Sequence, residues 1–517
     1  MGLTVIGDPG RCGPVHAALL GWARSHSVPI RTEATPTPVP SPALRFLDWF
    51  ERQSLRARGR VPTPLPPAQV PPGPALKEDP ELMIDLSGKP TARAGLRVTL
   101  DPPPDDPASG FAEVAATAPQ TRTVLTVGGT PVSSMSFPTQ DTWVQNRHRL
   151  LAYQAQQILE WLAGRPHAAP VAPAPPPVRP SAVRPSAVRP SAVAAQTGRV
   201  LARDAGRVAR RITGTTDEYW SVALCQGDWW EYWRSPQVVP NPPGGFLADP
   251  FLCEFRGRRA LFVEEWVGGL GRGRISVCAL TGGLPGQPQP IIEESFHLSF
   301  PFPVEVAGEL YMIPEAGGSR EVRVYRCERF PDRWVLHSVI MDDLFYADPI
   351  LLAQDGLWFL LLGTDRSGVG DVNAQLAVYW SEDPLSTHWT PCPSLVTDSL
   401  QARSGGLLWD ATGHPFRVRQ QHGFGEYGVG VSIGRIRELS RQAFREDPVQ
   451  DIRAGAGALG IHHVSAIPGL TALDFRVRRR ARTTSPPPAF PDVERDPAPG
   501  AGRTWTYSGG DGSGTGY

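Results

Sequence analysis

Two aspartates in identical settings are the residues of this chain best suited to chemistry. Asp249 and Asp348 each stand in the tripeptide Ala-Asp-Pro, and each opens one copy of a weak repeat. Cleavage of a glycosidic bond usually needs two carboxyl groups beside that bond, one as base or nucleophile and one as acid. The pair therefore suits acid–base chemistry on a sugar if the fold brings both residues together. The competing interpretation is that each aspartate only caps a turn before its proline.

Six further polar side chains in or beside the repeat motifs are candidate site residues. Glu315 is a candidate acid, and Arg403 carries a guanidinium fork that suits a phosphate or a carboxylate. The other candidates for substrate binding are His297, Glu265, Gln420 and His462. Each has a structural alternative. Glu265 follows Glu264 in an expected strand, so one of the two must face outward, and a histidine in a β core is commonly a hydrogen-bonded structural residue.

A five-fold repeat between Asp249 and Phe475 would position these side chains. Each copy begins with an apolar stretch expected to form a strand. A glycine then marks a turn, and a second apolar strand follows. The copies begin at Asp249, Phe300, Asp348, Gly405 and His462, and the glycines are Gly257, Gly308, Gly356, Gly413 and Gly469. A spacing of roughly 50 residues is typical of propeller blades. A β-sandwich would also give many strands, but the constant phase favours a five-bladed β-propeller, in which the blade-opening residues meet at one axis.

Composition divides the chain into four segments. They are a small degenerate α/β domain (1–166), a Pro/Ala/Arg-rich linker with a short basic helix (167–215), the propeller (216–476) and a disordered tail (477–517). The linker repeats Arg-Pro-Ser-Ala-Val three times, which predicts an extended spacer. Whether the front domain docks on the propeller is left open by the sequence.

Two helices are expected outside the propeller. The first runs from Trp143 to Ala163, with Thr142 as its cap and an apolar stripe. The second spans residues 199–212, where apolar residues recur between arginines. Such a basic amphipathic helix either packs on a domain edge, which we favour, or lies on an anionic membrane.

The charge balance and the cysteines exclude several function classes. The chain has 51 Lys+Arg and 51 Asp+Glu residues, so a nucleic-acid partner is not expected. No apolar run approaches the ~20 residues of a membrane helix, and no secretory signal is visible, which predicts a cytoplasmic protein. Near-exclusive use of arginine over lysine suggests a bacterial source.

The six cysteines show no metal spacing, so buried thiols are favoured over a disulfide. No metal or cofactor is expected, and the oligomeric state stays open.

Several motifs in the repeat resemble a known family. Among them are Phe246-Leu-Ala-Asp-Pro-Phe-Leu, Tyr311-Met-Ile-Pro-Glu, Arg329-Phe-Pro-Asp-Arg-Trp and Arg403-Ser-Gly-Gly. They look like the N-terminal domain of plant glucosamine inositolphosphorylceramide transferases and its bacterial relatives. That domain is similar to the five-bladed propellers of arabinanase, levansucrase and invertase-type glycosidases. The resemblance implies a carbohydrate ligand, but no reaction, because the plant proteins are expected to carry their transferase chemistry in a separate domain.

The resemblance also implies roles for particular residues. In the similar glycosidases an Asp of blade one is base or nucleophile and an Asp of blade three orients the substrate, which matches Asp249 and Asp348. Their acid is a Glu near the start of blade four, where this chain has Gln401-Ala-Arg403. Arginine cannot donate a proton usefully because its pKa exceeds ~12. Two functions therefore remain open: action on a glycan or sugar phosphate, by glycosyl transfer or hydrolysis, or non-catalytic glycan binding or scaffolding.

The front half resembles a formyltransferase-like segment more faintly. The motifs that carry this resemblance are Leu44-Arg-Phe-Leu-Asp-Trp-Phe-Glu, Ile84-Asp-Leu-Ser-Gly, Gly110-Phe-Ala-Glu-Val and Asn146-Arg. Formyl transfer in that family needs an Asn-His-Asp set, and residues 27–147 contain no histidine. We therefore expect this domain to be degenerate and inactive.

Overall fold

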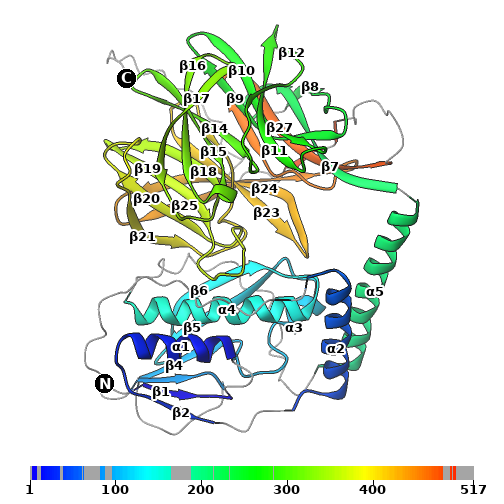
Figure 1. Ribbon diagram of the computed structural model, residues 1–517, viewed down its shortest axis with the longest axis vertical. Helices are drawn as coiled ribbons and strands as arrows, with labels where there is room; N and C mark the ends of the chain where they lie inside the picture. The colour runs from blue at the N-terminus through cyan, green and yellow to red at the C-terminus, as the bar shows by residue number, and fades with distance from the viewer. Residues whose placement is uncertain are drawn as a thin grey trace, which may run out of the picture.

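The computed structural model describes residues 3–8, 13–34, 39–60, 62, 82–87, 96–164, 188–213, 215–231, 233–282, 284–480, 490–491 and 493–495. Expectations for Cys12, for residues 167–187 of the linker and for most of the tail lie outside these residues. Figure 1 shows an α/β domain and a larger all-β domain, joined by one long helix at the edge of the molecule.

The front domain is a six-stranded sheet in the order β2-β1-β3-β4-β5-β6. The first four strands are parallel, and the last two join antiparallel. Its strands are β1 (Leu3–Ile6), β2 (Ile30–Glu33), β3 (Leu82–Asp85), β4 (Leu96–Asp101), β5 (Gln120–Val127) and β6 (Thr130–Pro138). Its helices are α1 (Gly13–Ser25), α2 (Pro42–Ala57), α3 (Phe111–Ala115) and α4 (Trp143–Leu162).

Helix α4 confirms the expected helix at 143–163. The Thr142 side chain caps it by accepting a hydrogen bond from the Gln145 N–H at 3.4 Å. Leu151, Ile158 and Leu162 pack with α1 on the apolar face of the sheet. Both faces of α4 are nevertheless used, because its polar side contacts the propeller.

The all-β domain is a five-bladed propeller, as the repeat predicts. Blade one contains β9 (Gly245–Phe255), β10 (Arg258–Val267), β11 (Arg272–Thr281), β12 (Leu284–Pro285) and β13 (Gln289–Ile292). Blade two contains β14 (Ser299–Val306), β15 (Glu309–Glu315), β16 (Val322–Arg329) and β17 (Arg333–Met341). Blade three contains β18 (Tyr346–Gln354), β19 (Leu357–Thr364), β20 (Leu376–Ser381) and β21 (Thr390–Val396). Blade four contains β22 (Ser404–Trp409), β23 (Pro415–Gly423), β24 (Glu426–Leu439), β25 (Phe444–Ala454) and β28 (Val493–Arg495).

Blade five is assembled from both ends of the propeller. It pairs β26 (Val464–Ile467) and β27 (Leu470–Arg480) with β7 (Thr215–Gln226) and β8 (Arg234–Val238), in the order β26-β27-β7-β8. Trp229 and Trp233 therefore lie in the loop that joins β7 to β8 of this closing blade, although both come before the start of the repeat at Asp249. Two further corrections concern the tail: β27 runs past the expected boundary at 476, and β28 pairs with β25. Backbone pairing to a neighbouring strand explains why both parts are ordered.

All five repeat copies share one backbone feature, and three of them share a second. All five predicted glycines occupy tight hairpin turns with φ between 72° and 80°, a region that suits residues without a Cβ. Asp249, Phe300 and Asp348 also have positive φ, at 47–48°. Each lies where its strand pairing breaks register, as at a β-bulge. The bulges redirect the blade-opening side chains toward the centre of the ring.

Helix α5 (Pro190–Thr213) is longer than the expected basic helix. It begins nine residues earlier and takes in most of the third Arg-Pro-Ser-Ala-Val unit, which the sequence pattern placed in an extended linker. Proline is tolerated in a first helical turn, and Val193 is buried against the front domain, in a cluster with Leu44 and Leu47 of α2. None of the described helices is long and apolar enough to span a bilayer.

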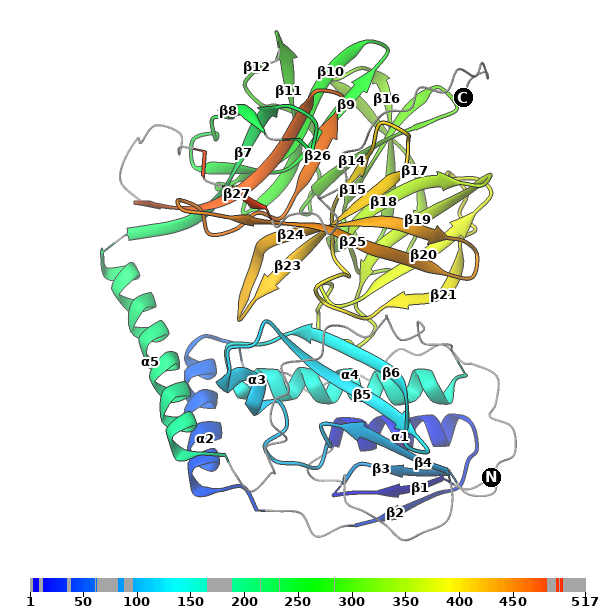
Figure 2. The same cartoon turned by 180° about the vertical axis from the view of Figure 1, so that it is seen from behind.

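The front domain docks on blades three and four of the propeller. Met135, Phe137, Leu150 and Tyr153 form an apolar cluster with Ala374 from the β19–β20 loop. The Ser136 N–H donates to the Thr397 carbonyl at 2.8 Å, and Gly425 N–H donates to the Thr139 carbonyl at 3.1 Å. Figure 2 shows β6 and α4 facing the propeller. The two domains are therefore in direct contact through apolar and polar groups.

Candidate axial site

The blade-opening aspartates are buried near the propeller axis, as predicted. Asp249 of β9 and Asp348 of β18 are 4% and 1% exposed. Both side chains accept hydrogen bonds from other blades, so neither simply caps its own turn. Asp249 Oδ2 accepts from the Phe300 N–H of blade two at 3.1 Å. Asp348 Oδ2 accepts from Gln420 Nε2 of blade four at 2.8 Å.

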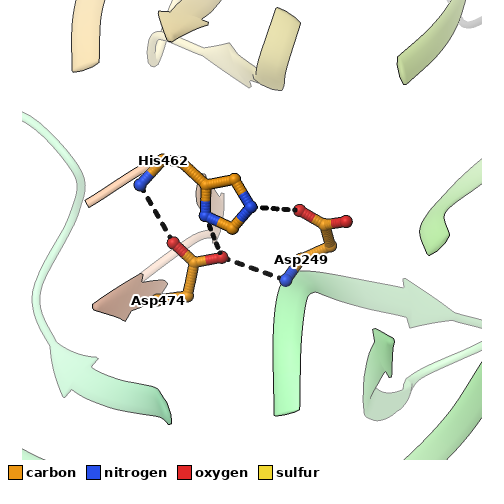
Figure 3. Close-up of side chains that lie close together, drawn as sticks. All are labelled: Asp249, His462 and Asp474. Carbon is orange, nitrogen blue, oxygen red and sulfur yellow. Dashed lines mark hydrogen bonds and ion pairs between the residues drawn. The ribbon is translucent and has the colours of Figure 1, made fainter. Parts of the chain in front are cut away.

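His462 lies between two aspartates (Figure 3). Its Nδ1 is 2.8 Å from Asp474 Oδ2, and its Nε2 is 3.3 Å from Asp249 Oδ1. Asp474 of β27 also accepts the backbone N–H groups of His462, His463 and Asp249 at 3.0–3.1 Å. Asp474 thereby fixes the ring of His462 and the start of the β9 bulge together.

Arg403 is surrounded by acceptors from other loops and strands. Its Nε donates to Asp348 Oδ2 at 2.6 Å, and its Nη1 donates to Asn373 Oδ1 at 3.0 Å. Its Nη2 lies 3.4 Å from Glu315 Oε2, while Glu315 Oε2 also accepts the Asp348 N–H at 3.1 Å. The guanidinium predicted to bind a phosphate is therefore already held by two carboxylates. It supports the site rather than presenting an open anion fork.

The two adjacent glutamates of β10 point in opposite directions. Glu265 forms a two-pronged ion pair with Arg274 at 3.1 Å and accepts from Ser276 Oγ at 2.5 Å. The structure therefore does not bring Glu265 into the axial cluster, which corrects the sequence-based choice. Glu264 faces the axis instead, opposite Ala248 in the pairing of β10 with β9. The pairing of β10 with β11 is continuous across this region, so Glu264 and Glu265 simply alternate, and the sequence pattern does not say which of the two faces the axis.

His297 lies beside Glu264 at the more exposed side of the cluster. Its Nδ1 accepts the Gly273 N–H at 2.8 Å, and its Nε2 is 3.8 Å from Glu264 Oε1. The side chain is 40% exposed, against 10% for Glu264. Burial lowers the pKa of His297, which leaves a neutral ring with its Nε2 hydrogen directed at Glu264.

Aromatic rings complete the cluster next to the histidine. The Trp220 ring lies 3.8 Å from that of His462, centroid to centroid, and Tyr427 makes an edge contact with it at 5.4 Å. Arg403 lies over the Tyr427 ring at 5.3 Å. Trp220 and Tyr427 are partly exposed, and the faces of such rings suit the C–H groups of a sugar.

Burial shifts the protonation of the acids strongly. Burial raises the pKa of Asp249 to about 7 despite the opposing charge of His462, and raises that of Asp348 to about 7 despite Arg403. Burial, reinforced by the charge of Asp249, raises the pKa of Glu264 well above its usual range. Burial opposes the protonation of His462, but the charge and hydrogen bond of Asp474 and the charges of Asp249 and Asp348 together outweigh it, so the pKa of His462 is raised. These shifts favour the protonated form of Glu264 and place the titration of Asp249 and Asp348 near neutral pH, whereas the pKa of Asp474 is lowered, against its burial, by the charge of His462 and its hydrogen bonds.

Several axial residues were not predicted from the sequence. They are Glu264, Asp474, Asn373, Tyr427 and Trp220. All five lie away from the blade openings, in later strands of a blade, in a long loop or in the strands that close blade five. The alternation of side chains along a strand shows that either Glu264 or Glu265 faces inward. It does not show which of them does, so both should have been candidate site residues.

One set of side chains among the described residues has ligand atoms close enough for a metal ion. The relevant atoms of Asp249, His462 and Asp474 lie within 4.8 Å of one another. However, both oxygens of Asp474 already accept hydrogen bonds, and His462 bridges the two aspartates. The hydrogen bonding fits a buried acid–histidine–acid arrangement, and we assign no metal to it.

Comparisons with known proteins match the propeller. Residues 237–455 match the family model described as "Glucosamine inositolphosphorylceramide transferase 1, N-terminal". Two relatives are named glucosamine inositolphosphorylceramide transferase 1. The one from Oryza sativa subsp. japonica is 33% identical to this chain over 238 residues, and the one from Arabidopsis thaliana is 33% identical over 211 residues. These regions cover 43% and 40% of this chain but only 32% and 27% of the relatives. The resemblance inferred from the motifs is confirmed, and the chain spans about a third of the length of these relatives.

Solved structures with a similar arrangement are glycoside hydrolases. The catalytic domain of Coprinopsis cinerea GH62 alpha-L-arabinofuranosidase is 10% identical, with a TM-score of 0.34 over 44% of this chain and 90% of that one. A GH43_1 enzyme from Xanthomonas citri is 13% identical, with a TM-score of 0.34 over 47% and 89%. At these TM-scores the likeness carries no argument, and the fold assignment rests on the sheet order. The formyltransferase-like origin of the front domain stays a prediction.

Proposed function

We propose that the axial cluster binds a carbohydrate and performs acid–base chemistry at a glycosidic or glycosyl bond. The observation that carries the proposal is the burial of Glu264 and Asp249 near the axis, where burial and the charge of Asp249 raise the pKa of Glu264. Glu264 would donate a proton to the leaving oxygen, while Asp249 would act as base or nucleophile. In this proposal Glu264 supplies, from blade one, the acid that is missing at the start of blade four.

The charges of the cluster favour a neutral or amino sugar over a phosphorylated one. Five carboxyl groups (Asp249, Glu264, Glu315, Asp348 and Asp474) surround two cations, Arg403 and His462. Since Arg403 is engaged by Asp348 and Glu315, an added phosphate would meet an acidic environment. The relatives' name contains glucosamine, an amino sugar whose ammonium group would complement that environment.

Two measurements would test the proposal. The first is the turnover of a panel of 4-nitrophenyl glycosides, and the second is calorimetric titration of the protein with glucose, glucosamine and glucose phosphate. We expect Glu264→Gln and Asp249→Asn to lower turnover by about 100-fold or more while sugar binding persists. Glu265→Gln is the position-matched control, compared after its melting temperature is checked, and it should keep the wild-type rate. Equal turnover in Glu264→Gln and wild type would remove Glu264 from the reaction.

A second candidate function is glycan binding without catalysis. The near-complete burial of Asp249 and Glu264 favours it, because a reacting bond must reach both catalytic groups. This candidate predicts micromolar-to-millimolar sugar binding with no turnover in the wild type. Absence of binding for every sugar, with the protein folded, would contradict both candidates.

A further inference from the structure

Helices α2 and α5 lie side by side at the edge of the molecule (Figure 1), and polar side chains of the two helices bond to each other. Ser54 Oγ donates to Asp204 Oδ2 at 2.6 Å, and Arg58 forms an ion pair with the same aspartate. Gln196 Nε2 donates to the buried Glu51 at 2.9 Å. The charged groups that usually face water are thus used for packing the two helices.

The outward side of α5 is apolar along most of its length. Among the α5 side chains that the structure describes, the exposed ones after the first turn are Ala194, Ala195, Gly198, Leu201, Ala202, Ala205, Val208, Ala209 and Ile212. Leu201, Val208 and Ile212 are 53%, 57% and 79% exposed, and their spacing of seven and four places them on one stripe. From Ala194 to Ile212 the stripe extends about 27 Å. A surface helix normally buries such a stripe.

The outward side of α2 adds aromatic rings and arginines. Phe46 and Trp49 are 50% and 57% exposed, with ring centroids 6.0 Å apart. Arg45, Arg52 and Arg56 are exposed around them.

Among the acids of the two helices, Asp48 offsets one of these arginines, Arg52, and the described ion pairs give Arg45 and Arg56 no acidic partner. Asp48 is half-buried and paired with Arg52, Glu51 is buried, and Asp204 is half-buried and paired with Arg58. The exposed surface of the pair is therefore apolar and cationic, although the whole chain has a formal net charge of zero.

We propose that the outward faces of α2 and α5 dock this protein on an anionic membrane surface. The apolar stripe would lie at the boundary between headgroups and acyl chains, with Phe46 and Trp49 in the interface where aromatic rings are favoured. The exposed arginines would contact lipid phosphate and carboxylate groups. This proposal extends the membrane alternative for the basic helix, and it is compatible with the helix also packing on a domain edge.

Vesicle sedimentation with the full chain would test the proposal. We expect binding to vesicles of phosphatidylcholine with phosphatidylserine to exceed binding to phosphatidylcholine alone by about tenfold. Binding should weaken as salt is raised, because salt screens exposed charges. Equal binding to both vesicle types, or binding to neither, would overturn the proposal.

Matched variants locate the binding surface. Trp49→Asp and Leu201→Asp should each lower the bound fraction about tenfold, while Leu336→Asp should not, since Leu336 is 47% exposed on β17 in blade two. Melting temperatures show whether each variant is folded. Sedimentation velocity gives the remaining outcome: a wild-type dimer that Leu201→Asp converts to monomer, without vesicle binding, would assign the surface to a second copy of this chain and overturn the membrane proposal.

Discussion

At the scale of single residues, the axial site depends on acids that are buried within reach of one another. The repeat phase predicted Asp249, Asp348 and His462, because each opens a copy and the first strands of a propeller surround the axis. Arg403 and Gln420 are also axial, and Glu315 and His297 lie at the more exposed side. The side chains that define the proposed chemistry are Glu264 and Asp249, and the charge of Asp249 opposes the ionisation of Glu264.

Buried Asp249 should make folding stability depend on pH. Its pKa is about 7 when folded, against 3.8 ordinarily, so the folded protein binds a proton between these values that the unfolded chain has released. This contribution to stability is present below pH ~4 and is lost as the pH rises through about 7. Urea denaturation at pH 5, 6, 7 and 8 should show a smaller decline for Asp249→Asn than for wild type. Parallel curves would contradict the assignment.

Gly273 makes room for two side chains of the site. A Cβ there would lie 2.8 Å from both Glu264 Oε1 and His297 Cε1, and 2.5 Å from the Leu298 carbonyl oxygen. We expect Gly273→Ala to lower the free energy of unfolding by about 1–3 kcal/mol.

The matched control for this substitution is Gly269→Ala, whose Cβ would meet nothing within 4 Å. It should change stability by less than about 0.5 kcal/mol. Both variants can be compared by chemical denaturation, and similar losses would show that crowding at Gly273 is not the cause.

At the scale of elements, one loop connects the front domain to the axial site. The β19–β20 loop carries Asp371, which accepts from Arg149 at 2.6 Å and from Tyr153 at 3.3 Å, both on α4. The other oxygen of Asp371 accepts from Asn373 at 3.0 and 3.1 Å, and Asn373 in turn holds Arg403. A continuous hydrogen-bonded path thus joins α4 to the acids of the propeller.

Breaking this path should affect both domains. Arg149→Ala would leave the fully buried carboxylate of Asp371 without its cation, and we expect a loss of about 1–3 kcal/mol. Scanning calorimetry should also show the front domain melting separately from the propeller. The control is Arg259→Ala, which removes an exposed ion pair with Glu254 and should cost less than about 1 kcal/mol. A single unchanged transition in Arg149→Ala would contradict the coupling.

Elements were predictable where the local pattern is strong. The propeller hairpins follow from the constant position of a glycine in each repeat copy. Helix α4 follows from the capping residue Thr142 and from its apolar periodicity. The start of α5 was missed because Pro190 and the alanines after it resemble a linker, and only contact of Val193 with α2 makes them helical. Glu264 was missed for a similar reason, since alternation along β10 places either Glu264 or Glu265 inward, and only packing against the rest of the propeller decides which.

At the scale of the whole molecule, the propeller is a ring closed by its two ends. The strands β7 and β8 come from residues 215–238, and they complete a blade whose inner strands come from the end of the repeat. The sequence pattern could not reveal this closure, because the repeat was recognised from Asp249 onward and β7 has no copy of the motif.

Removing the closing strands should prevent folding of the propeller. A chain lacking residues 1–238 would leave β27 without its partner β7, and it would expose Leu473 and Phe475, which pack with Ala223 and Cys225 of β7. We expect little soluble protein and weak cooperativity in thermal circular dichroism. A chain that begins at Thr215 keeps both strands and should melt cooperatively. Equal behaviour of the two fragments would show that blade five does not need β7 and β8.

The closing pair has a consequence for the protein's synthesis. Ala223 of β7 pairs with Leu473 of β27, about 250 positions later, so a ribosome working at about 5–20 residues per second would make the partner roughly 12 to 50 seconds later. Throughout that delay the nascent chain carries an apolar strand with an open hydrogen-bonding edge. Newly made chains would therefore be most prone to aggregate before the last blade emerges, and chaperones would be most useful in that interval.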